Sequence, residues 1–170
     1  MTKDKIETIN NLFDGSNIRS VWNSEINDYY FSVVDVIAAL TDNSYNKSRN
    51  YWKWLKNKLK EEGSQLVSDT NQLKMQSSDG KFYKTDTLDT KGILRLIESV
   101  PSPKAEPFKI WLAQLGSDRI DEVFDPEKAI QRAVNYYRQR GYSDEWIEKR
   151  LRGIISRKKL TDTWHDNGIT

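Results

Sequence analysis

Residues 29–40 read YYFSVVDVIAAL and contain a change from strand to helix. The aromatic residues at the start of this stretch end a β-hairpin that begins at about Asn17. Ser32 and Asp35 then have the form of a capping box, which satisfies free backbone N–H groups in the first turn of a helix. The apolar residues of that helix recur at helical spacing: Val33, Val36, Ile37 and Leu40. The stretch therefore predicts a strand that leads directly into a buried helix.

Further elements are predicted on the carboxyl side of this stretch. They are a helix from Ser48 to about Glu62 that Gly63 ends, a hairpin with strands at 73–76 and 81–88, a helix at 90–100, and a helix with Ser102 as its cap. The last helix has an apolar face at core spacing: Phe108, Trp111, Leu112 and Leu115. Together these elements indicate an α+β fold, in which two β-hairpins pack with several helices over residues 1–125.

Residues 126–170 are expected to add an αα-hairpin. A helix starts at Asp125 to Glu127, a turn follows at Arg140 to Ser143, and a second helix comes after it. The apolar stripes of the two helices are wider than one partner helix covers. The sequence leaves open whether the hairpin covers residues 1–125, pairs with a second copy of the chain or adds a DNA contact. A homodimer is attractive, because two linked basic helices bind DNA more tightly than one.

The composition excludes several classes of chemistry. None of the 170 residues is cysteine, so disulfides, thiolate metal sites and cysteine nucleophiles are absent. The single histidine, His165, lies in a polar tail, which argues against a histidine-based triad or a two-histidine metal site. No stretch approaches the roughly 20 apolar residues of a membrane span. We therefore expect a soluble cytoplasmic protein without a membrane segment.

A metal-dependent nuclease would need two or three carboxylates on one metal ion. The nearest candidates are Asp79 beside Lys81, and Asp86 with Asp89. An Asp-Gly turn explains Asp79, and Asp89 suits the cap of the helix that follows. The sequence therefore predicts no enzymatic activity, no metal and no cofactor, and a nuclease is the least favoured function.

The net charge of +2 hides a basic cluster, because residues 47–60 contain six basic side chains and no acidic one. On a helix, one face of this segment packs: Tyr51, Trp52, Leu55 and Leu59. A stripe of cations lies beside that face: Arg49, Lys53, Lys56 and Lys60. Lys47 and Lys58 lie on the other flank, with Trp54 between them.

Like charges at helical spacing repel one another unless an anion neutralises them. The phosphate backbone of a nucleic acid is the usual anion of this extent, and the exposed rings of Trp54 and Tyr45 could stack on bases. The predicted DNA-binding residues are Lys47, Arg49, Lys53, Trp54, Lys56, Lys58 and Lys60. The alternative interpretation is a solvated lysine-rich face that only aids solubility.

Three groups of residues occur in a characteristic order. Phe31 is followed by Val34-Asp-Val36 and Leu40, then come residues 87–96, and then Lys104, Ala105, Phe108 and Trp111. This series resembles the N-terminal domain of the BRO family of prophage antirepressors, over about residues 18–124. The resemblance implies a DNA-binding regulator of phage or viral origin. The long loop at 63–76 and the αα-hairpin depart from the basic domain of the family.

Two functions remain from these observations. The first is a DNA-binding transcriptional regulator of prophage antirepressor type, which uses the helix at about 48–62 on double-stranded DNA. The second is a protein-binding antirepressor that sequesters a repressor and does not contact DNA. Affinity for DNA would fall steeply with salt, whereas an apolar protein contact would depend on salt weakly.

Overall fold

The computed structural model describes residues 7, 9–10, 13, 15–166 and 168. The chain divides into two units, Met1–Ala113 and Gln114–Thr170, and the boundary between them falls inside one helix, α6 (Glu106–Phe124). Among the described residues, no helix combines the length and the apolar character needed to cross a membrane.

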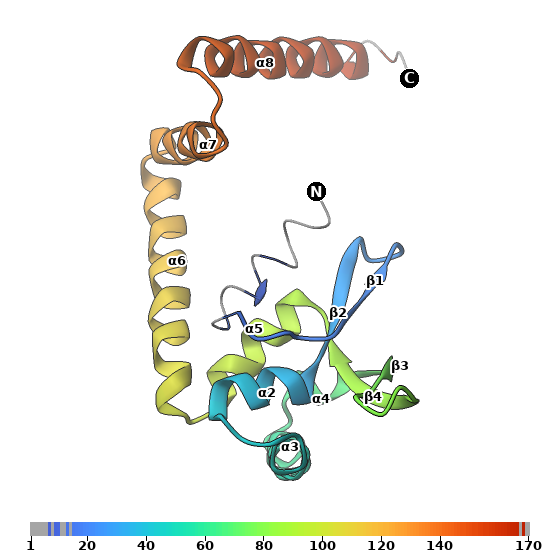
Figure 1. Ribbon diagram of the computed structural model, residues 1–170. Coiled ribbons are helices and arrows are strands. Elements are labelled where there is room, and N and C mark those ends of the chain that lie inside the picture. The colour runs from blue at the N-terminus through green and yellow to red at the C-terminus, as the bar shows by residue number, and fades with distance from the viewer. Residues whose placement is uncertain (1–6, 8, 11–12, 14, 167, 169–170) are drawn as a thin grey trace. The chain divides into compact units, whose positions relative to one another are not determined.

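The first unit contains one antiparallel sheet with the strand order β1-β2-β4-β3 (Figure 1). Its strands are β1 (Ser20–Asn23), β2 (Asp28–Ser32), β3 (Asn71–Gln76) and β4 (Phe82–Leu88). The two predicted β-hairpins are confirmed, and they join edge to edge through a short pairing of β2 with β4. In that pairing Phe31 lies opposite Leu88 and Ser32 opposite Thr87. The rest of β4 pairs with β3 alone, so these two strands extend beyond the shared edge as a two-stranded ribbon.

The α+β class is also confirmed, since helices follow both hairpins. The helices of the first unit are α2 (Val33–Thr41), α3 (Tyr45–Glu61), α4 (Gln65–Ser68), α5 (Thr90–Ser99), the 3₁₀ turn η1 (Pro103–Ala105) and the start of α6. Helix α3 begins three residues before the predicted Ser48, because Ser44 is its cap. Ser48 lies within the helix, where its hydroxyl donates a hydrogen bond to the Ser44 carbonyl oxygen and its side chain is buried.

Helix α2 lies at the centre of the core. The Ser32 hydroxyl accepts a hydrogen bond from the backbone N–H of Asp35, as the capping motif predicts. The predicted apolar face is buried, and Val34 is buried as well. The buried face of α2 packs in one cluster with side chains from β2, α3, β4 and α5, among them Phe31, Leu55, Leu88 and Ile93. The local pattern of residues 29–40 therefore determines the element around which the first unit is built.

An ion pair fixes the amino end of the sheet to α2. The Arg19 guanidinium donates to both carboxylate oxygens of Asp35, from Nε at 2.8 Å and from Nη2 at 2.9 Å. Its Nη1 donates to the backbone carbonyl oxygen of Gln76 at 3.1 Å, and its carbon Cζ lies 5.5 Å from the ring centroid of Tyr45. The hydrogen bonds to Asp35 raise the pKa of Arg19 above its ordinary value, so the guanidinium stays charged. One side chain therefore connects the first hairpin, α2, the end of β3 and the start of α3.

The prediction that α6 buries its apolar face is wrong. No described residue of α6 is buried, and Trp111 and Leu115 are 39% and 40% exposed. Phe108 is the member of that face that packs on the core, where its ring stacks on Phe13 at a centroid distance of 5.1 Å. Helical spacing identifies an apolar stripe but does not identify the surface that covers it.

The second unit contains the predicted αα-hairpin, formed by α7 (Glu127–Gln139) and α8 (Asp144–Asp166). The turn between them needs Gly141, whose φ of 84° is in the region that favours glycine. The ring of Trp146 stacks on the ring of Tyr142, with 4.0 Å between the ring centroids. It packs edge-to-face with the ring of Tyr137, with 5.4 Å between the centroids. Within the described residues of this unit, Ile147 alone is buried.

The exposure of α6 gives a stability prediction. We expect Trp111→Ala to lower the free energy of unfolding by much less than the ~3–5 kcal/mol of a buried tryptophan. Leu40→Ala is the matched comparison, because Leu40 on α2 is fully buried, and we expect it to cost ~2–5 kcal/mol. Urea unfolding of both variants measures the two values. Equal losses of stability would contradict the exposure of Trp111.

Candidate nucleic-acid interface

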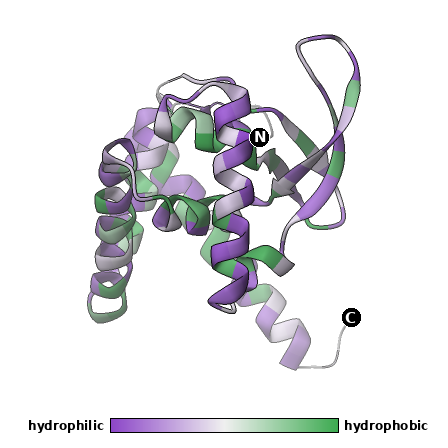
Figure 2. Cartoon of the chain, turned by 90° about the horizontal axis from the view of Figure 1, so that it is seen from below, coloured by the Kyte–Doolittle hydropathy of each residue, from purple (hydrophilic) through white to green (hydrophobic). Residues whose placement is uncertain are grey.

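Helix α3 separates an apolar face from a basic one. Trp52, Leu55 and Leu59 are buried in the core, and Tyr51 is half-buried beside them, as the helical spacing predicts. Gly63 follows the end of the helix with a φ of 69°, where the chain turns out of the helix. No acidic residue lies in the first turn, and none occurs in α3 before Glu61. The solvent face of α3 is therefore cationic along almost its whole length, and Figure 2, which views the chain from the side of α3, colours this helix mostly hydrophilic.

The predicted DNA-binding residues all lie on the solvent side of α3, but they form two groups. Arg49, Lys53 and Lys56 line a groove between α3 and the β3–β4 ribbon. The others lie outside that groove: Lys47, Trp54, Lys58 and Lys60. The Trp54 side chain is 52% exposed, but two neighbours contact its ring. Lys58 Nζ lies 5.5 Å from the centroid of the indole, and the centroid of the Tyr51 ring lies 5.5 Å from it.

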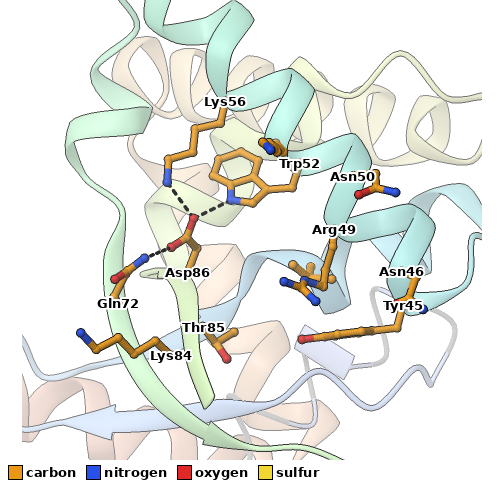
Figure 3. Close-up of a pocket in the computed structure, with 12 residues that line it drawn as sticks. Tyr45, Asn46, Arg49, Asn50, Trp52, Lys56, Gln72, Lys84, Thr85 and Asp86 are labelled. Carbon is orange, nitrogen blue, oxygen red and sulfur yellow. Dashed lines mark hydrogen bonds and ion pairs between the residues drawn. The ribbon is translucent and has the colours of Figure 1, made fainter.

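The groove has a volume of about 670 Å³ and basic side chains on both walls (Figure 3). Helix α3 contributes Arg49, Lys53 and Lys56, and the ribbon contributes Lys84. Tyr45 lies at one end of the groove and Gln72 at the other. Cations that face each other across a groove focus their field into it, which favours a polyanion.

Asp86 on β4 connects the two walls. Its Oδ2 accepts hydrogen bonds from Trp52 Nε1 at 2.8 Å and from Lys56 Nζ at 2.9 Å. Its Oδ1 accepts a third from Gln72 Nε2 at 3.0 Å (Figure 3). One carboxylate thus accepts hydrogen bonds from two side chains of α3 and from one side chain of β3. It also neutralises Lys56, which leaves Arg49, Lys53 and Lys84 as the uncompensated charges of the groove.

The environment of Asp86 keeps it ionised. Burial by itself raises the pKa of a carboxyl group. The hydrogen bonds from Lys56, Trp52 and Gln72 outweigh that effect and hold the pKa of Asp86 below its ordinary value. The negative charge in the groove is therefore permanent at neutral pH.

The carboxylates considered for a nuclease have structural roles. Asp79 accepts from the Tyr83 hydroxyl at 2.6 Å and from the Lys81 backbone N–H at 2.9 Å, and the hydrogen bond from Tyr83 lowers its pKa. Asp89 caps α5 by accepting from the backbone N–H of Gly92 at 2.8 Å. Within the described part of the chain, no group of three histidine, aspartate or glutamate side chains could hold a metal ion.

The second hairpin contributes to this site, which the sequence did not predict. Gln72 and Lys84 line the groove, and both are on one face of the ribbon, because Gln72 pairs with Asp86 and Lys74 with Lys84. The signal was present in β3, where polar residues at 72, 74 and 76 alternate with Leu73 and Met75, but β4 has four consecutive polar residues and shows no alternation. Only the pairing of the strands shows that these polar positions share a face.

Residues 17–124 match the N-terminal domain of the BRO family. No curated protein and no solved structure matches the chain.

Asp86 gives a prediction with a defined pH dependence. We expect Asp86→Asn to lower the free energy of unfolding at pH 7 by about 1.5–3 kcal/mol, because hydrogen bonds to a charged group are lost. A carboxyl with a lowered pKa stabilises the fold above its unfolded pKa, near 3.9, and loses that effect as the pH falls through the folded pKa. The difference between parent and variant should therefore shrink below about pH 4. Urea unfolding from pH 7 to pH 3 measures it.

Asp69→Asn is the control for this series, because the side chain of Asp69 is exposed and its partner Arg95 is 3.8 Å away. This substitution should change stability little at any pH. A pH-independent difference between the parent and Asp86→Asn would contradict the role of the charged carboxylate.

Proposed function

The chain belongs to the BRO family, whose N-terminal domain it contains at residues 17–124, and on that premise we propose a cytoplasmic DNA-binding transcriptional regulator of prophage antirepressor type. The family is associated with phage antirepressors and DNA-binding proteins, and this domain is generally non-catalytic. Double-stranded DNA is the proposed ligand, and α3 is the proposed principal contact.

The observation that carries the proposal is the uncompensated charge of α3. Of its six basic side chains, Lys56 has a carboxylate partner, Asp86. Within the described residues, no ion pair involves the other five: Lys47, Arg49, Lys53, Lys58 and Lys60. Five of the six cations of α3 are therefore not offset by an ion pair with a described carboxylate. A face kept cationic in this way suits the release of counterions from phosphates.

The competing interpretation is a solubilising face. A solubilising face needs charged side chains but no particular arrangement of them. A mixture of lysines and acidic residues makes a surface as soluble as lysines alone. The α3 face instead combines cations with a groove and with the exposed rings of Tyr45 and Trp54. These features favour a nucleic-acid ligand over simple solubility.

A second candidate function is the capture of a repressor protein. The observation in its favour is the exposed apolar surface of the second unit, which includes Phe124, Ile130, Ile155 and Trp164 at 52–84% exposure. A repressor bound there would bury apolar area, and its affinity would depend weakly on salt. The basic groove would then have no role, which makes this candidate the weaker one.

We assign that apolar surface to a second copy of the chain. The start of α8 contains three acidic residues, Asp144, Glu145 and Glu148, which pair within the chain with Arg138, Lys149 and Arg152, and its later half is basic at 157–159. When two α8 helices pair antiparallel about Leu151, each acidic segment lies opposite the basic segment of the other copy. Two copies would also present two α3 faces to one duplex, which raises affinity without a new kind of contact.

The proposed DNA contact predicts a change in salt dependence. Arg49→Gln with Lys53→Gln should weaken binding to a random 20-base-pair duplex. Each phosphate contact contributes about 0.9 to the slope of log affinity against log salt, so the slope should fall by about 1.8. Fluorescence anisotropy at several salt concentrations measures it. Lys56 is left unchanged, because its loss would also disturb Asp86.

Lys91→Gln is the control for this measurement, since Lys91 is exposed on α5 and does not line the groove. It should bind DNA with the slope of the parent. If the parent itself binds no duplex at low salt, or if the double variant keeps the parental slope, the DNA-binding proposal for α3 fails.

The dimer predicts a concentration-dependent mass. The full chain should sediment as a dimer at micromolar concentration, and Ile154→Glu with Ile155→Glu should shift it to monomer, because both side chains are exposed on α8. Glu145→Gln serves as a milder variant that removes one charge of the proposed pairing. A parent that stays monomeric at high micromolar concentration would contradict the dimer.

A further inference from the structure

The β3–β4 ribbon contains a pair of lysines that lie opposite each other. Lys74 on β3 lies directly opposite Lys84 on β4 in the strand register, and both side chains are exposed. Like charges directly opposite each other on one face of a sheet are destabilising. Among the described residues, neither lysine has an ion-pair partner. An external anion between them would remove the repulsion.

The two faces of the ribbon differ in exposure. Residues 72, 74 and 76 of β3 share a face with residues 82, 84 and 86 of β4, because side chains alternate along each strand. On the opposite face, Met75 and Thr87 are buried. The first face has Gln72 and Asp86 at one end, beside α3, and Gln76 and the exposed Phe82 at the other. Its two lysines lie between these ends.

Hydrogen bonds attach the ribbon to the rest of the first unit at both of its ends. At the end near α3, Asp86 accepts hydrogen bonds from Trp52 and Lys56. At the other end, the Gln76 carbonyl oxygen accepts from Arg19 Nη1 at 3.1 Å. The turn that joins the strands is closed by a hydrogen bond of 2.8 Å from the Ser77 backbone N–H to the Lys81 carbonyl oxygen, and Gly80 has a φ of 79°. The lysine pair is therefore presented on a preorganised support, which lowers the entropy lost on binding.

We propose that the β3–β4 ribbon is a second DNA-contacting arm, which grips a phosphate strand of the duplex from the side opposite α3 through Lys74 and Lys84. Lys84 shares the groove with Arg49 and Lys53 of α3, and Lys74 extends the same charge along the ribbon. A two-stranded ribbon fits the width of the major groove. The inference rests on the proposed function, because it names the partner of α3 on the same DNA.

The test uses the full chain with Lys74→Gln and Lys84→Gln together. Binding to the same random 20-base-pair duplex is measured by anisotropy over a range of salt concentrations. The slope of log affinity against log salt should fall by about 1.8, the value for two phosphate contacts. The melting temperature should stay the same or rise, because the substitutions remove a repulsive pair. A merely structural role for the lysines would lower the melting temperature and leave the slope unchanged.

Three variants separate this inference from the function on which it rests. Lys91→Gln on α5, which removes one lysine charge away from the ribbon and the groove, is the control and should keep the parental slope. If Arg49→Gln with Lys53→Gln lowers the slope and the ribbon variant does not, the ribbon is not a DNA arm, although α3 still is. If the parent shows no salt-dependent binding to duplex DNA, both the inference and the proposed function are overturned.

Discussion

The carboxylate of Asp86 is the interaction on which the candidate site depends. It accepts hydrogen bonds from an indole and an ammonium group of α3 and from an amide of β3, at 2.8–3.0 Å. Without it, Trp52 would bury an indole N–H with no acceptor, and Lys56 would add its charge to a groove that is already cationic. Burial of a lone carboxylate is unfavourable, but three donors reverse the balance and lower its pKa. The relative position of α3 and the ribbon is therefore set by one acidic group in a basic surrounding.

Arg19 complements this interaction at the other end of the same surface. It pairs with Asp35 on α2 and donates to the Gln76 carbonyl oxygen at the end of β3. The ribbon is thus attached to the body by an acid at one end and by a base at the other. Asp86 accepts three hydrogen bonds, two of them from α3, and Arg19 donates one to the ribbon while it pairs with Asp35. Both groups are charged, and charge-assisted hydrogen bonds of this kind are stronger than neutral ones.

The parts of the fold that depend on neighbouring residues could be predicted from the sequence. The cap at Ser32, the buried face of α2 and the packing face of α3 all follow from periods of three and four residues. The interactions that build the groove could not, since Asp86 meets Trp52 and Lys56 across 34 and 30 residues of chain. The four residues of α4 are too few to show a period. Trp111 does lie on a helix, as the spacing of apolar residues predicts, but it is exposed. No sequence pattern shows whether another surface covers an apolar stripe.

Helix stability does not explain all the cations on α3. The positive end of a helix dipole is at its N-terminus, so Lys58 and Lys60 in the last turn stabilise α3, whereas Lys47 and Arg49 near its start oppose the dipole. No acidic residue in the first turn offsets them. The capping hydrogen bond from the Lys47 backbone N–H to the Ser44 hydroxyl oxygen is long, at 3.5 Å. The unfavourable charges thus gather at the end of α3 where Arg49 and Tyr45 line the groove. Lys84 lies across the same groove, and an anion bound between the two walls would offset the charges of Arg49 and Lys84 together.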